Sequence, residues 1–115
     1  MSPSLEEVFI GVAEQVLVQN RKIITVAGDT FSVIATPRHK LKQINFRFDG
    51  REFRGLQQNP DTKSRWAEMA RSGKKVMQFL EAGRYLAVVA DGKLISFGKT
   101  PKYRDDERSS RSSSE

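Results

Sequence analysis

Residues 44–55, INFRFDGREFRG, carry the strongest chemical signature of the chain, because arginines alternate with phenylalanines along two adjacent runs. Sheets that bind single-stranded nucleic acid place aromatic rings beneath bases and basic side chains against phosphates. Asp49-Gly50 predicts a two-residue hairpin turn, which would set Phe46 opposite Phe53. Since side chains alternate between the faces of a strand, these phenylalanines would lie on the face opposite their neighbouring arginines. We therefore expect the phenylalanines to lie in the core and the arginines to contact phosphates. Base stacking on these phenylalanines is not expected.

Cations gather in this hairpin, in the loop before it and in the helix expected after it. A surface of this kind gives affinity for polyanions with little sequence preference. Lys74 and Lys75 also suit the dipole at the end of that helix, which is a structural explanation for their position. The candidate residues for binding nucleic acid or a partner are Lys40, Lys42, Arg47, Arg51, Arg54, Lys63, Arg65, Arg71, Lys74 and Lys75.

The sequence offers little for catalysis. Nucleophilic catalysis needs a nucleophile, a nearby base and an orienting group. The only histidine, His39, lies between Arg38 and Lys40, and we expect it to be solvated. The absence of cysteine excludes disulfides, a thiol nucleophile and a cysteine-based zinc site, and a single histidine argues against a transition-metal site. Neither phosphate-cradling glycine motif is present. We expect a protein that is not an enzyme and uses no metal or cofactor.

Charge is distributed unevenly along the 115 residues, whose net charge is +6. Residues 1–20 carry three acids and no bases, whereas residues 21–60 carry eight bases and three acids. A folded basic surface is expected from this layout, and polyanions are its natural partners. Many soluble basic proteins nevertheless bind no nucleic acid.

No apolar run approaches the ~20 residues that a membrane span needs, and acids stand where a secretion signal has bases. We expect a cytoplasmic protein without membrane contact.

Residues 4–19 predict a helix. Ser4 and Glu7 have the spacing of a capping box, and apolar residues follow at intervals of three and four. This apolar stripe has two interpretations. It is buried against the sheet, or it forms a surface for self-association.

Runs rich in β-branched and aromatic residues predict six or seven strands. Gly28-Asp29, Asp49-Gly50 and Asp91-Gly92 predict three tight hairpins, and residues 36–40 are expected to interrupt the sheet as a basic loop. In the last hairpin, both faces are apolar, so we expect it to be the most buried. Its turn would pair Val89 with Leu94, Val88 with Ile95 and Leu86 with Phe97. The expected strands are 22–27, 30–36, 41–48, 51–56, 75–80, 85–90 and 93–97.

A second helix is expected between the two β-rich halves, over residues 61–72. Asp61 would cap it, and Trp66, Met69 and Ala70 would share one face. An alternative continues this helix through Gly73 to residue 81. The exposed face is poor in polar side chains for reading a major groove, so sequence-specific duplex recognition is not expected.

These elements predict an α+β fold, with an antiparallel sheet of three hairpins, an N-terminal helix and a central helix. Whether the sheet stays open or closes into a small barrel is left undecided. Residues 1–98 are expected to form a single domain, and residues 99–115 a disordered tail rich in serine and charge. Two functions remain. The first is a binding module for RNA or single-stranded DNA, and the second is an adaptor that docks on an acidic protein through the same surface.

Overall fold

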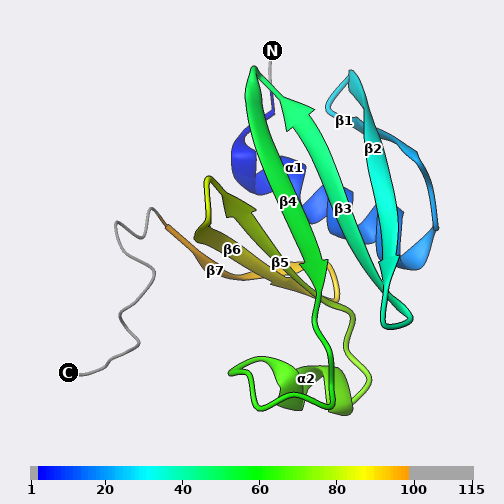
Figure 1. Cartoon of the computed structure of the whole chain (residues 1–115). Coiled ribbons are helices and arrows are strands. Elements are labelled where there is room, and N and C mark those ends of the chain that lie inside the picture. Colours follow the sequence, from blue (N-terminus) through cyan, green and yellow to red (C-terminus); the bar gives the residue numbers. More distant parts are fainter. Residues whose placement is uncertain (1–2, 99–115) are drawn as a thin grey trace.

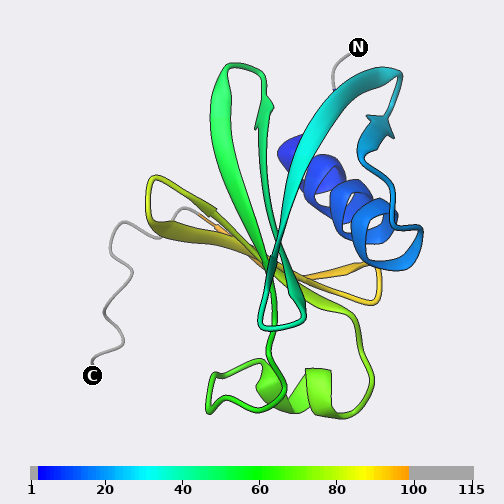
Figure 2. The same cartoon turned by 45° about the vertical axis from the view of Figure 1, so that its right-hand side comes forward.

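Seven strands form one antiparallel sheet in which each strand pairs with the next along the chain. The computed structural model describes residues 3–98. The sheet curves into a half-barrel around the N-terminal helix, which lies on its inner side (Figures 1 and 2). This confirms the α+β class and the predicted strand number. The strands are β1 Ile23–Val26, β2 Asp29–Arg38, β3 Leu41–Phe48, β4 Arg51–Gln57, β5 Val76–Glu81, β6 Arg84–Ala90 and β7 Lys93–Phe97.

The N-terminal helix consists of α1, Leu5–Ala13, and a π-helical continuation, η1, Glu14–Val18. The predicted capping box is present, because Ser4 and Glu7 satisfy each other's backbone N–H groups. Val8, Phe9 and Val12 are completely buried. Core packing therefore accounts for the apolar stripe, and self-association through this helix stays a prediction.

The core lies between this helix and the inner face of the sheet. The Phe9 ring stacks on Phe79 at 4.6 Å and meets the edge of Phe53 at 5.4 Å. The predicted register of the Asp49-Gly50 hairpin is confirmed, with Phe46 paired to Phe53. The phenylalanines of this hairpin consequently face the helix, as alternation predicted.

The sheet continues through the predicted break at 36–40, and that prediction is wrong. Strand β2 extends to Arg38 and pairs with β3 around a two-residue turn, His39-Lys40. Both turn residues have positive φ, 53° and 66°, which a type I′ turn requires. The first turn is also shifted by one residue, to Ala27-Gly28. Five two-residue turns, not three, therefore build the meander.

The last hairpin departs from its predicted register after one pair. Val89 pairs with Leu94 as expected, but a bulge then places Val88 opposite Ser96. Strand β7 is an edge strand, and Ile95 and Phe97 are exposed at 41% and 45%. The prediction that this hairpin is the most buried therefore holds for β6 and fails for β7.

The central helix is much shorter than predicted. Only α2, Ala67–Arg71, is helical, and Asp61 does not cap it. Instead, the Asn59 side chain accepts a hydrogen bond from the Asp61 N–H, which keeps the preceding segment in turns. The expected strand over 75–80 is confirmed by β5, so the longer helix is wrong. Trp66 and Met69 pack on a small second cluster that includes Val76 and Val88.

Within residues 3–98, no helix is both long and apolar enough to cross a membrane. The single domain over residues 1–98 stays a prediction. The predicted disordered tail, 99–115, lies outside the described residues.

Candidate functional site

The face of β2, β3 and β4 that points away from α1 is polar and open to solvent, and we call it the outer face (Figure 1). The β2–β3–β4 register fixes its members, because they alternate with the buried core residues along each strand. It consists of Ser32, Ile34, Thr36 and Arg38 from β2, Leu41, Gln43, Asn45 and Arg47 from β3, and Glu52, Arg54 and Leu56 from β4.

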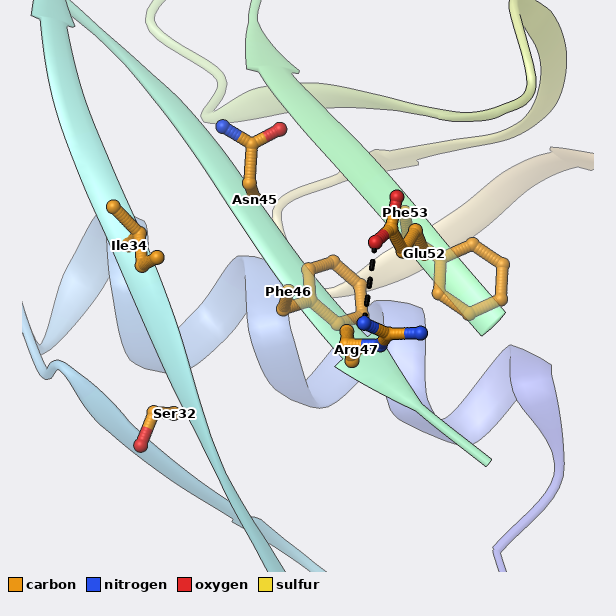
Figure 3. Close-up of a pocket in the computed structure, with 7 residues that line it drawn as sticks. All are labelled: Ser32, Ile34, Asn45, Phe46, Arg47, Glu52 and Phe53. Atoms are coloured by element: carbon orange, nitrogen blue, oxygen red, sulfur yellow. Dashed lines mark ion pairs between the residues drawn. The ribbon is translucent and has the colours of Figure 1, made fainter. Parts of the chain in front are cut away.

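Two adjoining hollows mark this face. The larger, about 490 Å³, extends over β2, β3 and β4, and Figure 3 shows Ile34, Asn45 and Arg47 around it. The smaller, about 260 Å³, lies between Arg54 on β4 and the turn between β5 and β6. Asn45 and Glu52 line both hollows, so we treat the two as one groove across the strands.

Four side chains form a square at the centre of the groove. Arg47 is paired with Glu52 across the two strands, and Asn45 is paired with Arg54. The arginines therefore occupy one diagonal and the amide and carboxylate occupy the other, at about 7–8 Å. Ile34 is paired with Asn45 on the neighbouring strand and is 69% exposed, which adds an apolar contact beside the square.

The outer face is electropositive. Arg38, Arg47 and Arg54 face only one carboxylate on this face, that of Glu52, which gives a net charge of +2. An Arg47 Nη1 atom lies 3.3 Å from Glu52 Oε2, with the two side chains 70% and 73% exposed. Such an exposed pair contributes little to stability and is easily exchanged for another partner. Arg54 makes no ion pair within the described part of the chain.

Acidic side chains lie on the opposite side of the sheet. Glu6, Glu7 and Glu14 are exposed on the N-terminal helix, which covers the inner face (Figure 2). Lys42 and Arg51 also project to this side, so the charge there is mixed, whereas the outer face has a surplus of positive charge.

Arg51 does not belong to the outer face, although it was predicted with Arg47 and Arg54. It lies on the inner face and donates from Nε to Glu81 Oε2 at 2.6 Å. A second ion-paired contact joins Arg51 Nη2 to Glu81 Oε1. The guanidinium also lies over the Phe53 ring at 5.2 Å. The hydrogen bond to Glu81 raises the pKa of Arg51 above its usual value. Arg51 thus joins β4 to β5.

Lys42 is likewise directed to the inner side. Its Nζ donates to the Val16 carbonyl at 2.9 Å and also to Asn20 Oδ1. The ammonium group therefore satisfies backbone at the end of the N-terminal helix, where a cation also suits the dipole. Its position is explained by the fold.

The remaining predicted cations are separated from the groove. Lys40 is exposed in the β2–β3 turn, and the others surround α2, beyond the end of β4 (Figure 1). Arg71 Nη1 donates to the Pro60 carbonyl at 2.6 Å and so holds the loop before α2. Arg65 lies over Trp66 at 4.8 Å. Lys63, Lys74 and Lys75 are exposed there.

Sequence reasoning missed Arg38, Ile34 and Asn45 as members of one site. Arg38 was assigned to a loop, whereas it ends β2 on the outer face and donates to Gln43 Oε1 at 3.1 Å. Ile34 lies within the predicted strand 30–36, and alternation from buried Val33 places it on this face; the missing feature was the turn that pairs β2 with β3.

Among residues 3–98, no three histidine, aspartate or glutamate side chains gather into a group suited to a metal ion. No protein-family model, curated protein or solved structure matches this chain.

Proposed function

We propose that this protein is a non-catalytic module that binds single-stranded nucleic acid across the outer face of β2, β3 and β4. The observation that carries the proposal is the composition of the groove. An exposed isoleucine and an amide, Ile34 and Asn45, lie beside arginines from two strands, and Arg38 lies further along β2 on the same face. The arginines would bind phosphates through their charge, and the apolar and amide side chains would contact the bases.

The arginines are placed for contact with a polyanion. Arg38 and Arg54 have no carboxylate partner among the described residues, and the exposed Glu52 holds Arg47 only weakly. A phosphate that approaches this face would gain charge-assisted hydrogen bonds without first breaking a buried ion pair.

The shape of the face favours a single strand over a duplex. Four neighbouring strands, β2 to β5, contribute to the groove, a width of about 14 Å at the usual strand spacing. A sheet of this width supports two or three unstacked bases in known sheet platforms. Reading a duplex requires an element that projects into the major groove, whereas this face is hollowed.

The buried phenylalanines limit what the site can do. Phe46 and Phe53 are 4% and 2% exposed, so they are not available to stack on bases. Affinity would come mainly from phosphate contacts, as expected for a module with modest sequence preference.

The absence of cysteine fits a module that acts in the cytoplasm.

Fluorescence anisotropy with the full chain tests the proposal. Labelled single-stranded RNA, single-stranded DNA and duplex DNA are titrated from about 50 to about 200 mM salt. If three arginines each neutralise one phosphate, the logarithmic salt slope for a single strand should be about −2. Duplex DNA should bind more weakly than either single strand. Binding that is confined to the lowest salt, or equal for duplex and single strand, would contradict the proposal and favour an acidic protein as the partner.

A further inference from the structure

Glu52 is a carboxylate in the middle of a surface otherwise suited to phosphate. It lines both hollows of the groove and is the only acid on the outer face. Near phosphates it would repel the ligand, because like charges at close range are unfavourable. A side chain that weakens the main attraction of the site needs an explanation.

Stability does not supply this explanation. The ion pair between Glu52 and Arg47 is 3.3 Å long and both side chains are more than two-thirds exposed. A pair of this kind stabilises a protein little or not at all. Since the backbone of β4 pairs with β3 over residues 51–56 and with β5 over residues 54–57, the strand does not depend on this side chain.

We propose that Glu52, together with Asn45, reads the edge of one base in the groove and selects a base with an exocyclic amine over uracil. The inference rests on the proposed function and concerns the same site. Glu52 and Asn45 occupy one diagonal of the central square, between the two arginines that would hold the flanking phosphates.

Hydrogen-bonding capacity determines the selection. An ionised carboxylate only accepts hydrogen bonds, whereas the amide of Asn45 both donates and accepts. Cytosine and adenine offer an amine at N4 or N6, which Glu52 would accept. Uracil and thymine have the O4 carbonyl in the equivalent place, and two acceptors repel each other. Ile34 would contact the ring of the same base, since it lies beside Asn45 in the larger hollow.

Cytosine and uracil give the sharpest comparison, because they are equal in size and differ at this edge. The wild-type protein should bind a labelled cytidine oligonucleotide about tenfold more tightly than a uridine oligonucleotide of equal length. In the E52Q variant this ratio should fall close to one, since an amide can rotate to accept from an amine or donate to a carbonyl.

Affinity for uridine should rise in E52Q, because the repulsion between the Glu52 carboxylate and the O4 carbonyl is removed. Since the same three arginines contact phosphate in both proteins, the logarithmic salt slope should stay at about −2. The matched control is E6Q, which removes the same charge from an exposed glutamate on α1, on the opposite side of the sheet. Its base preference and salt slope should equal those of the wild type.

The outcomes separate the inference from the proposed function. Equal wild-type binding of the two oligonucleotides, with an equal gain for both in E52Q, would overturn base reading by Glu52 and leave phosphate binding in place. Binding of neither oligonucleotide at near-physiological salt would overturn the proposed function and this inference with it. A cytidine preference that survives E52Q would also overturn the inference.

Discussion

Arg51 and Arg54 lie three residues apart on β4 and project from opposite faces of the sheet. Arg51 is held by Glu81 on the inner side, whereas Arg54 is exposed in the outer groove without an ion pair among the described residues. One strand thus carries a structural arginine and a candidate binding arginine. Substitutions at the two positions should have opposite consequences for stability and binding.

Replacement of Arg51 should lower stability and leave nucleic-acid affinity unchanged. R51Q removes two charge-assisted contacts to Glu81, so the free energy of unfolding should fall by about 1–2 kcal/mol. Urea denaturation measures the loss, and R54Q, which has no such partner, is the control. A loss of affinity in R51Q at unchanged stability would contradict the structural role.

This contribution should not vary with pH near neutrality. Because the folded pKa of Arg51 is raised, the stability that it adds is complete below the unfolded pKa and is lost only as pH rises through the folded value. Both values lie far above neutral pH.

Lys42 should likewise act on stability. K42M keeps most of the aliphatic stem but removes the donor to the Val16 carbonyl, at a cost of about 1–3 kcal/mol in the free energy of unfolding. K63M, in an exposed position near α2, should change stability by less than about 0.5 kcal/mol. If urea denaturation found the two variants equally stable, the capping role of Lys42 would be wrong.

Replacement of the His39-Lys40 turn should raise the stability of the protein. Both residues have positive φ, which costs L-residues roughly 1–2 kcal/mol each, whereas Asn-Gly suits a type I′ turn. H39N/K40G should therefore raise the free energy of unfolding by about 1 kcal/mol or more. Thermal denaturation measures the change. A lowered melting temperature would show that the turn side chains make contacts that outweigh their backbone strain.

Gly55 should not tolerate a side chain. An added Cβ would lie 2.9 Å from Ile44 Cγ1 and 3.0 Å from Met77 Sδ, in the core. G55A should destabilise the fold by about 1–3 kcal/mol. Gly98, where a Cβ meets nothing within 4 Å, is the matched control for the same substitution. Equal stability of G55A and G98A in urea would contradict the packing of β4 on β3 and β5.

Much of the β-structure could be predicted because Asp-Gly dipeptides mark two of its turns. Asp49-Gly50 gave the full register of β3 and β4, and Asp91-Gly92 gave the limits of β7. His39-Lys40 carries no glycine, so the hairpin that it forms was read as a loop. The bulge opposite Val88 and Val89 leaves Ile95 of β7 without a paired residue, and no turn residue in the sequence marks it.

The site was predicted in part. Alternation separated Arg47 and Arg54 from the phenylalanines, and the structure agrees. The same alternation places Arg51 on the face of Phe53 and Lys42 on the face of Ile44, since each pair is two residues apart. The prediction instead grouped all nearby cations into one surface because of their charge. The grouping of Ser32 and Ile34 with the groove required the pairing of β2 with β3 around His39-Lys40, which the sequence did not predict.

The most direct test of the outer face as the binding site compares charge reversal on that face with the same reversal elsewhere. R47E/R54E reverses two arginines of the outer face, and R21E/K22E reverses two exposed cations in the loop between η1 and β1. Both variants lower the net charge equally, and circular dichroism checks that both remain folded.

Each protein is titrated into labelled single-stranded RNA at near-physiological salt and followed by anisotropy. R47E/R54E should lose more than about tenfold in affinity, whereas R21E/K22E should stay within about threefold of the wild type. Equal losses of affinity in the two variants would mean that binding depends only on the net charge of the protein. Full affinity in R47E/R54E would contradict the outer face as the binding site.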